Sequence, residues 1–90
     1  MSGRTAVDVI CQHSKDGTII PMRVRLVTED GEYETFIITG YKQIEDPNIG
    51  IANRSILTFS CKVQAHERER RFKLVYYVNQ MTWYLEKFHE

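Results

Sequence analysis

Basic side chains gather in one short stretch of this chain. Four cations stand within six positions there, namely Arg68, Arg70, Arg71 and Lys73. Tyr77 follows, with the strand parity of Arg71 and Lys73. Cations that neutralise phosphates beside rings that stack on bases are typical of proteins that bind single-stranded nucleic acid. The same stretch, interleaved with glutamates, equally suits a solvated strand face that forms opposite-charge pairs across a sheet.

Two further arginines, Arg23 and Arg25, alternate with apolar residues in an earlier stretch and are predicted to point outward. We expect one sheet face to carry both basic groups and to contact a partner. The predicted contact residues are Arg23, Arg25, Arg71, Lys73 and Tyr77. The loop 43–54 is a second candidate contact surface, because binding residues concentrate in loops.

Other combinations of residues do not predict a metal site or a cofactor site. An acidic cluster surrounds one predicted turn, at Glu29, Asp30, Glu32 and Glu34. It lacks the D-x-D-x-D-G pattern of a calcium loop, so turn chemistry and solubility explain it. The three histidines lie far apart in the sequence, and none has a neighbouring ligand at metal-binding spacing.

The two cysteines, Cys11 and Cys61, both fall on predicted inward faces. A catalytic thiol needs a polarised and exposed setting, whereas a buried cysteine behaves as a small apolar residue. Because no nucleophile, paired carboxylates or pocket can be identified from spacing, we predict that the protein is not an enzyme.

Composition narrows the class of protein further. Ninety residues suffice for one domain, 1–90, with one modest core. Twelve basic residues balance twelve acidic ones, which argues against non-specific contact with phosphates but leaves a local patch possible. No apolar run is long enough to cross a membrane, and residues 1–15 contain no signal-peptide pattern. We therefore expect a cytoplasmic protein with no membrane partner and with reduced cysteines.

Two Asp-Gly pairs, at 16–17 and 30–31, bracket a run of alternating residues. Asp-Gly between apolar, β-branched stretches is a strong signal for a hairpin turn, because such turns need a positive φ. The first third of the chain is therefore predicted to be a three-stranded antiparallel meander. Predicted strands are 5–13, 18–28, 33–42, 55–65 and 70–78, and the segment 82–88 fits a strand better than a helix.

Alternation also assigns the residues that should face the core. Predicted inward residues are Val7, Val9, Cys11, Ile20, Met22, Val24, Leu26, Phe36, Ile38, Leu57, Phe59, Cys61, Val63, Phe72, Leu74, Tyr76 and Val78. Pro21 and Gly40 are expected to mark bulges, edges or bends, since proline cannot donate to a ladder and glycine has no side chain to pack. Ile10, Ile19 and Val27 are expected outside, where a contiguous apolar patch would mark a protein partner or self-association.

Together these patterns predict an all-β fold, a small antiparallel barrel or roll of five to six strands of the SH3-like or OB-like kind. Two three-stranded meanders joined by the 43–54 loop would form it. The leading functional hypothesis is a non-enzymatic binding or adaptor module that contacts another protein or a copy of itself. The alternative is a nucleic-acid-binding barrel that uses the same basic and aromatic face.

Overall fold

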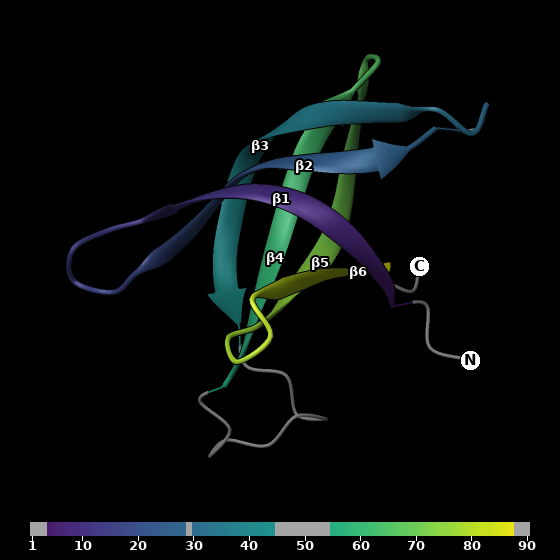
Figure 1. The fold of residues 1–90 in the computed structure, drawn as a ribbon. Helices are drawn as coiled ribbons and strands as arrows, with labels where there is room; N and C mark the ends of the chain where they lie inside the picture. The colour runs from purple at the N-terminus through teal and green to yellow at the C-terminus, as the bar shows by residue number, and fades with distance from the viewer. Residues whose placement is uncertain (1–3, 29, 45–54, 88–90) are drawn as a thin grey trace.

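The computed structural model describes residues 4–28, 30–44 and 55–87 and shows a closed antiparallel barrel (Figure 1). Six strands follow one another around the barrel in sequence order, and β6 returns to β1. They are β1 (Thr5–His13), β2 (Ile19–Val27), β3 (Tyr33–Ile44), β4 (Ile56–Ala65), β5 (Arg68–Tyr77) and β6 (Thr82–Lys87). The predicted all-β fold with six strands is confirmed, and the last segment is a strand.

No helix occurs in the described parts of the chain, so none there could cross a membrane. Gln43 and Ile44 of the predicted 43–54 loop belong to β3, and the remainder of that loop lies outside the described residues. Phe88, the last residue of the segment predicted as strand six, also lies outside them.

Tight turns join the strands at the predicted places. Gly17 and Gly31 adopt φ values of 90° and 80°, the region that residues with a Cβ rarely adopt. The β4–β5 turn is shorter than the sequence suggests, since only His66 and Glu67 form it, both with positive φ. Two such residues match the type I′ geometry of two-residue hairpins. As a result, β5 begins at Arg68, two residues earlier than its predicted start at position 70.

Two strands bend so that the sheet can close. β2 carries an extra residue between Pro21 and Arg23, opposite Ile10 and Cys11 of β1, and β3 carries one between Ile38 and Gly40. The predicted special positions of Pro21 and Gly40 are thus confirmed as bulges. A bulge inserts an extra residue and increases the local twist, which lets each strand turn from one neighbour to the next.

The bulge in β2 shifts the alternation of that strand and corrects three predictions. Ile20, expected inside, lies on the outward side of the strand and is not part of the core cluster. Met22, expected inside, is 43% exposed because it is the extra residue and points outward. Ile19, expected outside, packs against the core instead, and Pro21 is buried. Beyond the bulge the predicted phase holds again, with Val24 fully buried.

Val78 corrects one more inward prediction. It lies one residue past the end of β5 at Tyr77 and is 38% exposed.

The core fills the barrel with aromatic and aliphatic side chains. Phe59 and Tyr76 both contact Trp83, at ring-centroid distances of 5.7 and 4.6 Å. Around them lie the buried side chains of Val24, Phe36, Cys61, Val63, Ala65, Phe72 and Leu74. Val7, Val9 and Cys11 of β1 pack against this cluster as predicted. Burial of this apolar surface is the main force that closes the barrel.

Candidate binding cleft

The wall of the barrel opens where β1 changes neighbours. β1 pairs with β2 from Asp8 onward but with β6 through residues 5–7, and Figure 1 shows it arching between the two. β2 continues past this point to Val27, while β5 starts at Arg68, ahead of its described pairing with β6 at Phe72. The end of β2 and the start of β5 therefore diverge, and a cleft of about 1300 Å³ lies at this opening.

Five strands line this opening, which we call the arginine cleft. Its lining consists of residues 5–8, 25–27, 33, 68–72, 82 and 85. Apolar surface comes from residues of β1, β2, β5 and β6, among them Val7, Leu26, Phe72 and Leu85. A concave site with apolar walls and a few charged groups is the usual form of a binding site in a small domain.

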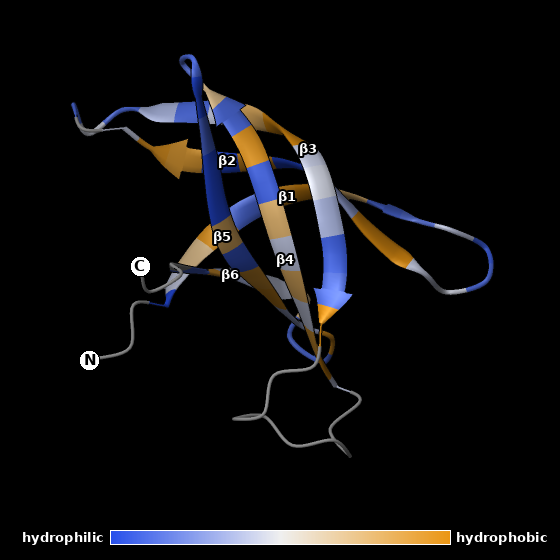
Figure 2. Cartoon of the chain, turned by 180° about the vertical axis from the view of Figure 1, so that it is seen from behind, coloured by the Kyte–Doolittle hydropathy of each residue, from blue (hydrophilic) through white to orange (hydrophobic). Residues whose placement is uncertain are grey.

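Arg68 and Arg70 point toward the inner side of β5 at the cleft. Their partners on β4 are Ala65 and Val63, which are buried in the core, so the pairing places both arginines on the same side of the sheet. Both are exposed, because β5 at this point extends beyond the closed part of the barrel. The first half of β5 accordingly appears as a continuous hydrophilic stretch (Figure 2).

The charges of the arginine cleft do not balance. Four arginines and two carboxylates line it. Asp8 lies 3.8 Å from Arg25, and Glu69 lies 3.1 Å from Arg71. Each carboxylate thus has an arginine within ion-pair distance, and Arg25 also stacks over the Tyr33 ring at 4.7 Å.

Arg68 and Arg70 are therefore the cations of the cleft that no described residue pairs with. An arginine on an apolar surface without a carboxylate partner is suited to recognise a carboxylate or phosphate from another molecule.

The five predicted contact residues do not share one face. β2 and β5 are separated by two strands in either direction around the barrel, so Arg23 lies on a different wall from Lys73 and Tyr77. The expectation of one common face is corrected by this topology. The opening nevertheless brings Arg25 and Arg71 to the same cleft.

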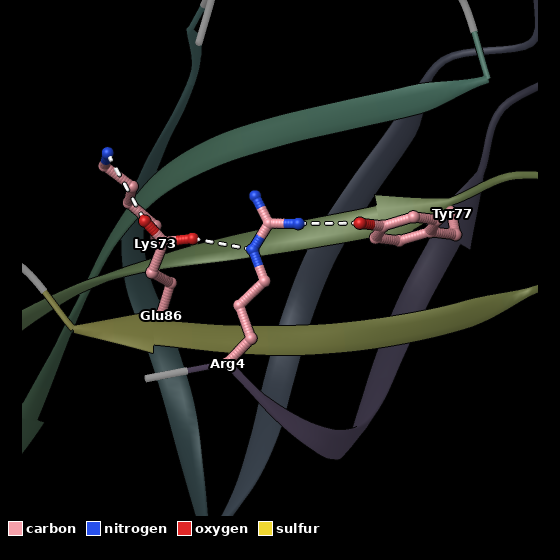
Figure 3. A network of polar contacts seen from close by, with 4 residues as sticks. All are labelled: Arg4, Lys73, Tyr77 and Glu86. Atoms are coloured by element: carbon pink, nitrogen blue, oxygen red, sulfur yellow. Dashed lines mark hydrogen bonds and ion pairs between the residues drawn. The ribbon is translucent and has the colours of Figure 1, made fainter. Parts of the chain in front are cut away.

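Lys73 and Tyr77 take part in contacts within the chain. Arg4 crosses the outer side of β5 and β6 (Figure 3), where its Nε donates to Glu86 at 2.8 Å and its Nη1 donates to the Tyr77 hydroxyl at 2.6 Å. Lys73 lies 3.9 Å from the same glutamate. We call this network the Arg4 clasp. Because these groups contact one another, Lys73 and Tyr77 link β5 to Glu86 and Arg4 and are less available to a partner than the cleft arginines.

The two cysteines are free, and both face the interior as predicted. Burial raises the pKa of the Cys61 thiol to about 12, so it is protonated at neutral pH. Burial also raises the pKa of Cys11, and a hydrogen bond with Trp83 partly opposes this. A protonated, buried thiol is a poor nucleophile. Within the described parts of the chain, no three His, Cys, Asp or Glu side chains are placed to hold a metal ion.

Arg68 and Arg70 belong to the basic cluster of the sequence but are not among the five predicted contact residues. The signal for Arg70 is its spacing from Phe72: residues two apart in a strand lie on the same side, and Phe72 points inward. The length of the β4–β5 turn cannot be predicted in the same way, because a positive φ is uncommon at any residue other than glycine and Glu67 gives no signal for one.

No protein-family model, curated protein or solved structure matches this chain.

Proposed function

We propose that this protein is a non-enzymatic binding module that holds an acidic segment of a protein partner in the arginine cleft. The observation that carries the proposal is the pair Arg68 and Arg70, exposed on an apolar surface and unpaired among the described residues. Such a pair favours a ligand that brings carboxylates and apolar side chains together.

A protein ligand fits this cleft better than a nucleic acid does. Asp8 and Glu69 lie beside the arginines and would repel a continuous phosphate backbone. Arg25 covers one face of the exposed Tyr33 ring at the cleft, so a base could not stack on that face. Acidic side chains on an otherwise apolar peptide can meet the two arginines without approaching those carboxylates.

A cytoplasmic setting belongs to the same proposal. The free thiols of Cys11 and Cys61 support it, because reduced cysteines are usual in that compartment. The high pKa of Cys61 argues against the use of this thiol as a nucleophile.

An amide NMR titration tests the proposal. The probe is a short peptide in which glutamate alternates with leucine or valine, and its control carries lysine in place of glutamate. We expect the acidic peptide to shift amide signals of residues 25–27 and 68–72, and the shifts to weaken at about 0.2 M salt, where exposed charges are screened. The lysine peptide should leave these signals in place.

Two matched double variants distinguish the effect of the cleft arginines on affinity from the effect of removing any two positive charges. The double variant Arg68→Ser with Arg70→Ser should weaken binding at least about tenfold, because it removes two charge-assisted hydrogen bonds to the peptide. Lys15→Ser with Lys42→Ser removes the same charge from exposed positions outside the cleft and should leave affinity within about twofold. Equal loss in both double variants would refute the proposal, and so would an oligonucleotide that shifts the cleft signals when the peptide does not.

A further inference from the structure

The outer side of β1, β2 and β3 carries a row of exposed side chains in which apolar residues surround one arginine. Ile10, Arg23 and Ile37 stand directly opposite one another on the three strands. Ile10 is 62% and Ile37 is 61% exposed. Met22 joins the row because the β2 bulge turns it outward beside Arg23. Neighbouring strands are only about 5 Å apart, so these side chains form one continuous patch. We call it the bare face.

The bare face contains an arginine that lacks a partner. Arg23 forms no ion pair with any described residue, and it is flanked by Ile10, Met22 and Ile37. A cation set among apolar side chains becomes a strong anchor when a carboxylate reaches it, because the contact removes water from around the pair.

A carboxylate of the same chain lies one row away. Asp8 stands diagonally across from Arg23, in the row it forms with Arg25. Its side chain is 85% exposed, and its contact with Arg25 is long, at 3.8 Å. The bare face therefore displays both members of a complementary charge pair beside its apolar patch.

We propose that the bare face binds a second copy of this chain across a two-fold axis. A two-fold interface joins the same surface of the two copies, so that surface must supply both members of every complementary pair. Arg23 of each copy would approach Asp8 of the other, and Ile10, Met22 and Ile37 would be covered. Asp8 also lines the arginine cleft, but the proposal uses neither Arg68 nor Arg70 and does not depend on the proposed function.

Sedimentation across a wide concentration range, up to millimolar, tests the proposal on the full chain. The unmodified protein should form dimers. Asp8→Arg and Arg23→Asp should each weaken dimers at least about tenfold, because each sets like charges against each other. The double variant that exchanges the two charges should restore dimers. Ile37→Ser, at an exposed position, should weaken them through lost apolar contact.

Lys15→Asp is the control, since it changes charge in the β1–β2 turn away from the row. It should leave the dimer unchanged. Far-ultraviolet circular dichroism establishes that each variant keeps its strands. A monomer at every concentration would overturn the proposal. A folded double variant that fails to recover dimers would overturn it as well, because the Arg23–Asp8 contact is its central element.

Discussion

The two outer walls of this barrel obey the same strand alternation but differ in what covers them. On the wall of β4, β5 and β6, the outward residues Val75 and Thr58 are 0% and 3% exposed. On the wall of β1, β2 and β3, Ile10 and Ile37 remain more than half exposed. An outward position in a strand is therefore not the same as an exposed one, and the difference depends on what lies over the sheet.

The Arg4 clasp accounts for part of this difference. Strand pairing places Glu86 opposite Lys73, Tyr84 opposite Val75 and Thr82 opposite Tyr77. A side chain that reaches from Glu86 to Tyr77 therefore passes over the row of Val75 (Figure 3). The ring of Tyr77 meets that of Tyr84 edge to face at 5.1 Å, beside the same row. Packing on this wall stabilises the barrel, whereas the other wall is available for contact.

The largest expected effect comes from placing a charge on each wall. Val75→Asp would bury a carboxylate without a partner and should lower the free energy of unfolding by more than about 4 kcal/mol. Ile37→Asp should cost about 1 kcal/mol, the range of strand propensity at an exposed site. Urea unfolding of both variants measures the difference. Similar losses would mean that the two walls do not differ as described.

A smaller effect is expected from opening the Arg4 clasp. Arg4→Ala removes the two hydrogen bonds that the Arg4 guanidinium donates to Glu86 and Tyr77. It should lower the free energy of unfolding by about 2 kcal/mol. Arg23→Ala removes an arginine of the bare face and should change it by less than about 0.5 kcal/mol. A double-mutant cycle of Arg4→Ala with Glu86→Gln should give a coupling of about 1 kcal/mol. Additive losses would show that the clasp does not act as a unit.

The sequence predicts the elements well because each is locally specified. Each local signal lies within a few residues of the turn, strand or bulge that it predicts. Examples are the Asp-Gly turns, the alternation in β4, and Pro21 and Gly40 beside their bulges. The inward phase of Phe36 follows from the same local rule. Local chemistry and the fold agree here, which is the usual mark of a sequence that specifies one structure.

The site is less predictable because it depends on closure. Alternation places Arg23 and Arg71 outward but cannot tell that β2 and β5 lie on different walls. Nor can it tell that Arg4 reaches Tyr77 from the other end of the chain. The arginine cleft arises because β1 leaves β2 for β6, and that choice of neighbour is a long-range property.

The smallest expected effect concerns the turn between β1 and β2, two of the strands that carry the bare face. Asp16 accepts hydrogen bonds from the Ser14 hydroxyl and, at 3.0 Å, from the Thr18 amide. These bonds lower the pKa of its carboxyl from 3.8 to about 2. Because the folded-state pKa lies below the unfolded one, the stabilisation is complete above pH 3.8 and is lost as the pH falls through 2.

Asp16→Asn keeps an acceptor oxygen but cannot be protonated in this range. Thermal unfolding at a series of acidic pH values should therefore show a shallower loss of stability in the variant than in the unmodified protein. Asp30→Asn changes the corresponding residue of the other Asp-Gly turn and is the matched control. If the stability of Asp16→Asn fell with pH in parallel with that of the unmodified protein, the charge of Asp16 would not contribute to the stability of the turn. The β1–β2 hairpin would then depend on strand pairing and on glycine geometry alone.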